Sequence, residues 1–210
     1  MWKIIKWDCL SIMCWMDDNS VDLTLTDIPY NEVNRPSNWL NVLDKWKADI
    51  LTFDLVEFCN QVIRITKSSV IIFCWQWQFS YIYNFLKQKK GTTRQLIWKK
   101  SNPSPMNGKH IYLSWIENAI WFKKPNWTFN AHCKNTVFKY PNWSSKLHPT
   151  EKNHWLLKEL ILDNSNEWDL VFDPCCWSGS HLLVAKENGR DYLWIELDED
   201  YYNVANERLK

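Results

Sequence analysis

Residues 170–196 read LVFDPCCWSGSHLLVAKENGRDYLWIE, and this stretch contains one complete β-α-β unit. The apolar run LVFD predicts a strand, PCCWSGS a tight turn, and the residues after it a helix. DYLWIE predicts a second strand that closes on Glu196, 23 positions after Asp173. In open α/β sheets such a turn lets the backbone approach an adenosine-bearing cofactor, and the acid accepts from ribose hydroxyls. The spacing alone does not decide the function, because any β-α-β unit with a chance glutamate shares it.

The rest of the chain alternates in the same way between short apolar runs and helical patterns. Strands are predicted at 4–7, 21–27, 68–74, 94–100, 170–173 and 191–197, and helices at 9–16, 50–66, 78–88, 153–163, 180–188 and 199–210. This alternation predicts a doubly wound, mostly parallel sheet with helices on both faces. The length favours a single domain over residues 1–210. Residues from about 101 to 147 are rich in Asn, Pro and Ser, and we expect an insert of irregular loops with short strands there.

Composition excludes several classes of protein. The apolar fraction is 46%, the net charge is +1, and no apolar run approaches the roughly 18 residues of a membrane span. The first ten residues do not resemble a signal peptide, so we expect a cytoplasmic protein. Seven cysteines without a CxxC pair argue against a disulfide framework and a zinc site, and no metal is expected.

Charge is distributed unevenly along the chain. Residues 58–150 contain 14 Lys and Arg and one acid, Glu117, whereas the remaining residues contain 11 Lys and Arg and 23 Asp and Glu. A basic middle segment is typical of a chain that meets a polyanion there. A solvated lysine-rich face would give the same count, so both interpretations stay open.

Two further motifs carry chemistry. TDIPY, at 26–30, follows an apolar strand and would place a carboxylate, a backbone carbonyl and a flat ring at one sheet edge. The two acceptors suit the hydrogens of an exocyclic amine, and Tyr30 suits stacking on a heterocycle, although a D-x-P-Y sequence is also common in turns. KLHPTEKNHWLLKELI, at 146–161, predicts the start of a helix with Thr150 as a cap.

Together these stretches resemble the DNA amino-methyltransferases in the permuted order, in which the catalytic motif precedes the cofactor motif. DIPY at 27–30 resembles that family's DPPY, and HPTEKN at 148–153 its HPTEKP. FDPCCWSGS at 172–180 resembles DPFxGSGT, and GRDYLWIELDEDYYNVANERL at 189–209 resembles GRxxxGIExDxxYxxxAxxRL. The resemblance covers nearly the whole chain, and four linked motifs are more specific than any one.

The resemblance implies an enzyme that methylates an exocyclic amine of a DNA base with S-adenosylmethionine. Asp27, Pro29 and Tyr30 would engage the target amine. Cofactor contacts fall on the turn, on the ribose acid, on the 148–152 motif and on the Asp following the first strand: Asp8, His148, Thr150, Lys152, Asp173, Pro174, Cys175, Trp177, Ser178, Gly179, Ser180 and Glu196. The basic segment would grip double-stranded DNA and the 101–147 insert would read bases. The target base would leave the duplex, and the amine would attack the methyl directly.

Tryptophan and glycine occur in unusual numbers. The chain has 16 Trp and 4 Gly, where ordinary usage predicts roughly 15 Gly. Trp177, Trp194 and Trp7 stand where the family has glycine, and an indole at 177 would occupy volume meant for the cofactor. One hypothesis is that the gene comes from an organism that reads the UGA codon as glycine, and that UGA was translated as tryptophan in this sequence. If the tryptophans are genuine, we expect a degenerate enzyme or a DNA-binding relic.

Other departures and alternatives remain. Ile28 replaces a proline and makes the backbone less rigid, and Asn153 replaces another. An Asp-led motif favours adenine N6 over cytosine N4 in this family, so adenine is expected and cytosine N4 is the alternative. The Pro174–Cys175 dipeptide resembles the nucleophile of carbon-5 cytosine methyltransferases, but its place inside the cofactor turn argues against them. Methylation of RNA or protein amines is disfavoured by the motif order. The resemblance also suggests a partner restriction endonuclease, while the oligomeric state is not predicted.

Overall fold

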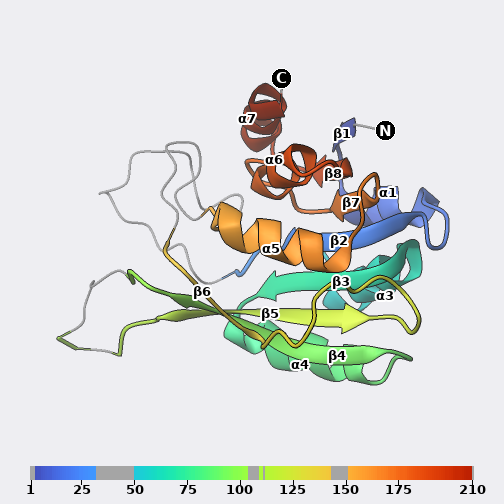
Figure 1. Cartoon of the computed structure of the whole chain (residues 1–210). Helices are drawn as coiled ribbons and strands as arrows, with labels where there is room; N and C mark the ends of the chain where they lie inside the picture. Colours follow the sequence, from blue (N-terminus) through green and yellow to red (C-terminus); the bar gives the residue numbers. More distant parts are fainter. Residues whose placement is uncertain (1–2, 32–49, 104–108, 111, 143–150, 210) are drawn as a thin grey trace.

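The computed structural model describes residues 3–31, 50–103, 109–110, 112–142 and 151–209. His148 and Thr150, two of the predicted cofactor residues, lie outside the described residues. Eight strands form one sheet in the order β1-β8-β7-β2-β3-β5-β4-β6 (Figure 1). Their bounds are β1 Lys3–Lys6, β2 Val21–Asp27, β3 Thr66–Cys74, β4 Thr92–Lys100, β5 Ile116–Lys123, β6 Val137–Tyr140, β7 Leu170–Asp173 and β8 Asp191–Glu196.

The sheet is mostly parallel, as predicted. Every described strand pair is parallel except the two that β5 makes, with β3 and with β4. The carboxyl ends of the seven other strands therefore meet at one edge, together with the amino end of β5. In open α/β sheets this edge is where ligands bind. It brings together the ends of β2, β7 and β8, which carry the three predicted motifs.

Helices cover both faces of the sheet (Figure 1). The described helices are α1 Cys9–Trp15, α3 Leu55–Ile65, α4 Gln76–Lys87, α5 His154–Asn164, α6 Ser180–Glu187 and α7 Glu199–Leu209. Side chains of α1, α3 and α4 pack in one core cluster, and those of α5 and α6 pack in a second cluster on the opposite face. A smaller third cluster joins α6, α7 and β8. The doubly wound fold class is thus confirmed. None of the described helices combines the length and apolar character needed to cross a membrane.

The segment 101–147, where irregular loops with short strands are expected, contains the eight-residue strand β5 and the four-residue strand β6. β5 lies inside the sheet between β3 and β4, and β6 pairs with β4 at the sheet edge. The apolar run AIWF at 119–122 explains the inner position of β5, because Ala119, Ile120 and Phe122 are buried. The basic residues around this run kept the sequence pattern from giving the bounds of the strand. Residues 101–115 therefore connect two long antiparallel strands.

Candidate active site

The TDIPY motif lies at the carboxyl edge, where β2 ends at Asp27 (Figure 1). The hydroxyl of Tyr30 donates to Oδ1 of Asp27 at 2.7 Å, and the Tyr30 ring stacks on Trp75 with 5.7 Å between ring centroids. Gln78, fully buried at the start of α4, donates its amide to the carbonyl of Pro29 at 2.7 Å. Ile28 is fully buried in the core. The loop thus keeps a fixed shape without the family's first proline.

The turn between β7 and α6 is held from beneath by Asp173. Its Oδ1 accepts the backbone N–H of Cys175 at 3.0 Å, and its Oδ2 contacts Nδ1 of His181 at 2.5 Å. Asp173 is fully buried and does not line the cavity described below. Ser178, Gly179 and Ser180 do not line it either. These four residues shape the turn in this structure, and their contact with the cofactor stays a prediction.

Glu196 ends β8 at the same edge. Its Oε2 accepts the backbone N–H of Trp177 at 2.7 Å and its Oε1 accepts the N–H of Asp198 at 2.9 Å. Burial raises the pKa of the Glu196 carboxyl to about 7, although the two backbone hydrogen bonds favour the ionised form. A nearly buried carboxylate with spare acceptor capacity suits ribose hydroxyls.

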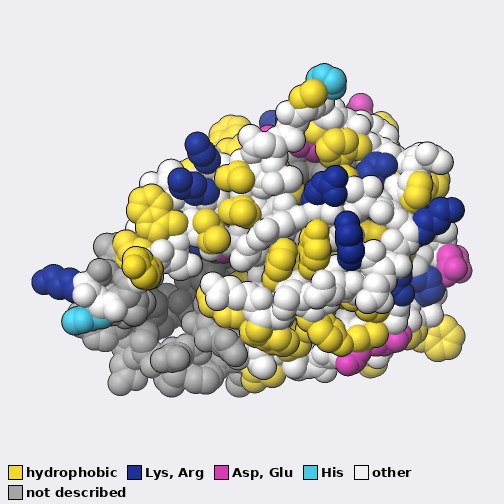
Figure 2. All heavy atoms as spheres, turned by 90° about the horizontal axis from the view of Figure 1, so that it is seen from below, with side chains coloured by type: hydrophobic (Ala, Val, Ile, Leu, Met, Phe, Trp, Pro, Cys, Tyr) yellow, Lys and Arg dark blue, Asp and Glu magenta, His cyan; other side chains and the backbone are white. Residues whose placement is uncertain are grey.

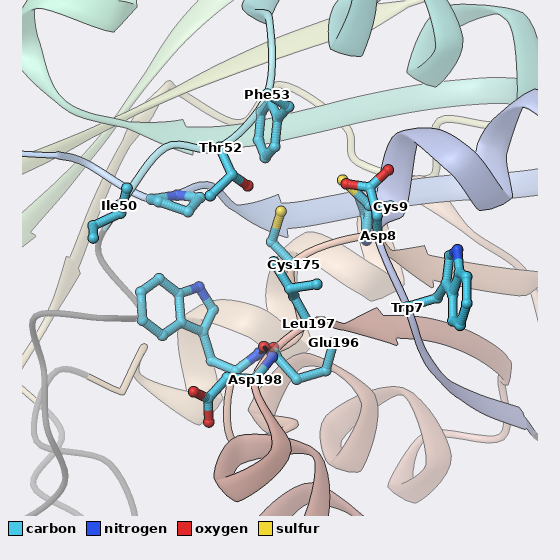
Figure 3. A pocket seen from close by; sticks show the side chains of 13 residues that line it. Trp7, Asp8, Cys9, Ile50, Thr52, Phe53, Cys175, Glu196, Leu197 and Asp198 are labelled. Atoms are coloured by element: carbon cyan, nitrogen blue, oxygen red, sulfur yellow. Dashed lines mark hydrogen bonds between the residues drawn. The ribbon is translucent and has the colours of Figure 1, made fainter.

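A cavity of about 200 Å³ connects these motifs (Figure 3). Six predicted site residues line it, namely Asp8, Pro29, Pro174, Cys175, Trp177 and Glu196. Asp8 also caps α1 by accepting the N–H of Ser11 at 2.8 Å. Apolar side chains that the sequence did not single out complete the wall: Ile50, Phe53 and Leu197. The catalytic and cofactor motifs therefore share one cleft.

Trp177 stands inside that cleft. Its backbone has a φ of +50°, in the left-handed region that favours glycine. Its indole Nε1 donates to the backbone carbonyl of Asp27 at 2.8 Å, and its ring meets Tyr201 edge-on. The indole thus spans from the cofactor turn to the catalytic loop. It occupies space between the groups that would hold the methyl donor and the methyl acceptor.

Two more tryptophans have unusual surroundings. Trp168, just before β7, has a φ of +69° and a largely exposed side chain. Trp194 is fully buried on β8, and its Nε1 finds no hydrogen-bond partner among the described residues. A Cβ at Gly179 would come within 2.3 Å of the Trp194 ring. Trp7, in contrast, is mostly exposed and lines the rim of the cavity.

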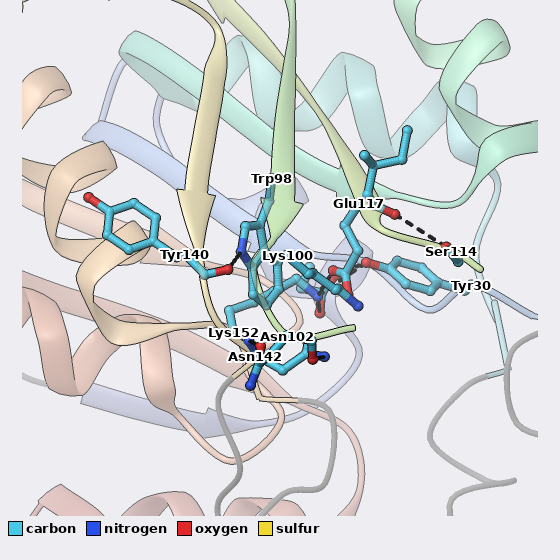
Figure 4. A network of polar contacts seen from close by, with 11 residues as sticks. Tyr30, Trp98, Lys100, Asn102, Ser114, Glu117, Tyr140, Asn142 and Lys152 are labelled. Atoms are coloured by element: carbon cyan, nitrogen blue, oxygen red, sulfur yellow. Dashed lines mark hydrogen bonds and ion pairs between the residues drawn. The ribbon is translucent and has the colours of Figure 1, made fainter. Parts of the chain in front are cut away.

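Lys152 lies between two carboxylates at the active edge. Its Nζ lies 2.5 Å from Oδ2 of Asp27 and 3.1 Å from Oε2 of Glu117 (Figure 4). Its contact with the cofactor carboxylate stays a prediction. Lys152 does not line the cavity. Burial raises the pKa of the Asp27 carboxyl, and the charge of Lys152 opposes this rise. Of the HPTEKN motif at 148–153, the structure describes Glu151, Lys152 and Asn153. Among these three, Lys152 is the residue that contacts Asp27.

Sequence reasoning missed Glu117 as a site residue. The signal was present, because Glu117 is the one acid among the 93 residues from 58 to 150. Trp75 and Gln78, which hold Tyr30 and Pro29, gave no comparable signal. Both lie at the start of α4, where the sequence shows only the apolar periodicity of a helix.

The residues at this site fit S-adenosylmethionine in their chemistry. Glu196 offers an acceptor for ribose hydroxyls, Ile50, Phe53 and Leu197 offer an apolar wall, and the turn at 174–177 exposes backbone to the cavity. The cavity is smaller than the roughly 300–1,000 Å³ of typical ligand pockets. The indole of Trp177 forms one wall of this cavity.

Comparison with known proteins agrees with this geometry. A family model described as DNA methylase, for N6- and N4-specific enzymes, matches residues 21–207. The chain belongs to this DNA methylase family. Proteins of the family transfer a methyl group from S-adenosylmethionine to an exocyclic amine of a DNA base, so the cofactor and the reaction class expected from the sequence are confirmed.

Individual relatives cover nearly all of the chain. The type II methyltransferase M.HinfI of Haemophilus influenzae is 27% identical over 99% of this chain and 68% of its own length. M2.DpnII of Streptococcus pneumoniae is 24% identical over 99% of this chain and 89% of its own. The crystal structure of an M1.HpyAVI–SAM complex superposes with a TM-score of 0.76 at 26% identity, covering 99% of this chain and all of that one. The cytosine-N4-specific PvuII DNA methyltransferase shares the fold, with a TM-score of 0.78 at 17% identity over 99% of this chain and 86% of its own.

Proposed function

We propose that this DNA methylase modifies the N6 amine of adenine in double-stranded DNA. The carrying observation is the Asp27 carboxylate at the end of β2, which accepts from the Tyr30 hydroxyl, while the backbone carbonyl of Asp27 accepts from the indole of Trp177 in the cofactor turn. An amine is oriented when its two hydrogens meet two fixed acceptors, which leaves the nitrogen lone pair for the incoming methyl. Asp27 supplies one acceptor. We assign the second to the carbonyl of Ile28, because the carbonyls of Asp27 and Pro29 already accept from Trp177 and Gln78.

Bound S-adenosylmethionine supplies the electrophilic methyl group, and the chain's own residues do the rest. Tyr30, fixed against Trp75, presents a flat face for stacking on a base that has left the duplex. After the transfer the nitrogen must lose one proton. Asp27 is placed to receive it, because burial raises the pKa of its carboxyl and makes it a better proton acceptor than an exposed carboxylate.

Two exposed lysines near the active edge suit contact with DNA phosphates. Lys99 of β4 and Lys139 of β6 pair in register on neighbouring parallel strands. Figure 2 shows the face on which α4 lies, where Lys and Arg side chains are spread among hydrophobic ones. Lys87 is the last residue of α4, and Lys89 and Lys90 follow it; α4 runs from the carboxyl edge back toward the opposite one. We therefore propose that only part of the basic segment meets DNA.

The segment 101–115 leaves the sheet between β4 and β5, at the active edge. We propose that it reads bases, as part of the 101–147 insert expected from the sequence. The names of two relatives as type II methyltransferases support a partner restriction endonuclease for this chain, which stays a proposal.

Transfer of tritiated methyl from S-adenosylmethionine to plasmid DNA tests the assignment of Asp27. We expect Asp27→Asn to lose at least 100-fold in rate, since it removes the charged acceptor. Asp163→Asn is the matched control: Asp163 is also buried and paired with a lysine, Lys134, at 2.7 Å, but lies on α5 away from the cavity. Equal rates for Asp27→Asn and the unchanged chain would overturn the assignment.

A further inference from the structure

Four charged side chains form a chain of ion pairs at the active edge (Figure 4). Nζ of Lys100 lies 2.6 Å from Oε1 of Glu117, whose Oε2 lies 3.1 Å from Nζ of Lys152, which in turn lies 2.5 Å from Oδ2 of Asp27. The Glu117–Lys152 contact is an ion pair whose angles fall outside hydrogen-bond geometry. Two cations and two anions alternate, so the charges balance.

These side chains are withdrawn from water. Only 4% of the Lys152 side chain is exposed, and 16 to 18% of those of Asp27, Glu117 and Lys100. Removing ions from water costs several kcal/mol each, and a buried ion network often stabilises a fold less than apolar packing would. Buried groups with perturbed pKa values cluster at functional sites. Because the four ions are costly to bury, we expect them to have a role other than stabilising the fold.

The topology explains how Glu117 reaches Asp27. β5 alone runs antiparallel, so the second residue of this strand stands at the edge where β2 ends. Lys100 is the last residue of β4, and its backbone N–H donates to the carbonyl of Trp115 at 2.8 Å. Lys100 and Glu117 therefore close the base of the 101–115 segment. The ion chain joins that base to the catalytic carboxylate.

We propose that Lys152 and Glu117 are positioning residues for Asp27. Lys152 fixes Oδ2, while the Tyr30 hydroxyl holds Oδ1 at 2.7 Å, so the carboxylate cannot rotate. Glu117 contacts Lys152 from the other side. The ammonium charge of Lys152 is therefore shared between two carboxylates and does not compensate that of Asp27 in full. The inference rests on the proposed function of Asp27 as the acceptor for the target amine, and it goes beyond the motif that the family shares, since Glu117 lies outside it.

The electrostatics of the cluster give the two residues opposite effects. Burial raises the pKa of Asp27, Lys152 lowers it, and Glu117 raises it further. The pKa of Glu117 is lowered despite its burial, because Lys152 and Lys100 lie on either side of it. Tyr30 and Cys74 also face Asp27, and the pKa of each is raised by burial and by the Asp27 charge, so both stay neutral while Asp27 titrates.

Titration of the Asp27 carboxyl carbon by NMR tests the proposal on the whole chain, without cofactor or DNA. The resonance is assigned by its loss in Asp27→Asn. We expect Lys152→Met to raise the midpoint and Glu117→Gln to lower it, each by about one pH unit or more. Lys134→Met, which removes a lysine paired with Asp163 and Glu159 instead, should leave the midpoint unchanged. If Lys152→Met does not fold, two other variants serve as the test. Lys152→Arg keeps the positive charge and should leave the midpoint near that of the unchanged chain, and Glu117→Gln, which keeps the shape of the side chain, should lower it.

Shifts of opposite sign support the positioning role, because general loosening of the fold would move both midpoints toward the value of an exposed aspartate. No shift in Glu117→Gln, or shifts in the same direction, would overturn it. In a methylation assay we further expect Glu117→Gln to lower kcat and leave the KM for S-adenosylmethionine unchanged, since Glu117 does not line the cavity. The titration does not depend on methylation, so failure of the proposed function is seen separately.

Discussion

Trp177 is the residue that we expect to affect cofactor binding most. Its φ of +50° costs a non-glycine residue about 1–2 kcal/mol, and its indole takes up part of the cavity. We predict that Trp177→Gly binds S-adenosylmethionine at least tenfold more tightly, a difference of about 1.4 kcal/mol, by isothermal titration calorimetry.

Trp168→Gly is the control for this measurement. Trp168 also has a positive φ, but it is mostly exposed and lies outside the cavity, so its replacement should leave cofactor affinity unchanged. Unchanged affinity in Trp177→Gly would show that the indole does not obstruct the site. The codon hypothesis has a separate test: a UGG codon at 177 rules it out.

Glu196 should make the stability of the fold depend on pH. Its pKa is about 7 in the folded chain and about 4.5 in the unfolded one. The folded state keeps this proton longer, so the stabilisation is complete below pH 4.5 and is lost as the pH rises through 7. The difference corresponds to roughly 3 kcal/mol. We predict that the free energy of unfolding in urea falls by that order between pH 4.5 and 8, and that Glu196→Gln removes most of the fall. An unaltered pH dependence in the variant would contradict this account.

At the scale of elements, the start of α5 supports the site. The side chain of Asn153 accepts the N–H groups of Trp155 and Leu156 and donates to the carbonyl of Pro141 at 3.0 Å. Next to it, Lys152 reaches Asp27. We predict that Asn153→Ala lowers the free energy of unfolding by about 1–2 kcal/mol, from loss of the cap, whereas Asn153→Asp retains most of it. Denaturant titration measures both, and equal stability of Asn153→Ala and the unchanged chain would show that the cap is dispensable.

The elements also show what the sequence could predict. All six predicted strands and six predicted helices correspond to elements of the structure, because long apolar runs and helical spacing report burial directly. Short strands are expected within 101–147, but the sequence did not give the bounds of the strand at 116–123, because its short apolar run AIWF lies in a basic, Asn-rich segment. Its reversed direction, which brings Glu117 to the active edge, depends on pairing with β3 and β4 across more than 15 residues of sequence. No local pattern encodes such pairing.

At the same scale, motif matching placed residues at the site more reliably than it assigned their contacts. Pro29, Cys175 and Glu196 line the cavity, as strand ends at one edge must. Asp173 does not line the cavity, because its buried carboxylate takes the nearest donors, here the Cys175 amide and His181. Its contact with the cofactor stays a prediction. Lys152 turned to the two carboxylates beside it for the same reason. Which partner a charged side chain selects depends on three-dimensional neighbours that one sequence does not reveal.

For the whole molecule, the uneven charge distribution predicts how the protein holds DNA. Lys99 and Lys139 stand together near the active edge, while Lys87 and Lys90 lie at the far end of α4. Each phosphate contact contributes about 0.9 to the slope of log affinity against log salt. We predict that the Lys99→Ala, Lys139→Ala double variant flattens this slope by about 2 in fluorescence-anisotropy titrations with duplex DNA. Lys87→Ala, Lys90→Ala should leave the slope unchanged, and equal slopes for both double variants would refute this assignment of the DNA face.

The central claim is that the transfer of a methyl group to an exocyclic amine takes place in one cleft, between the ends of β2, β7 and β8. Mass spectrometry of nucleosides tests it most directly, using plasmid DNA incubated with S-adenosylmethionine and either the chain or its Trp177→Gly variant. The account predicts N6-methyladenine, in greater yield with Trp177→Gly, and none with Asp27→Asn in that background. N4-methylcytosine in its place would contradict the choice of adenine, and 5-methylcytosine or unmodified DNA from both proteins would contradict the claim itself.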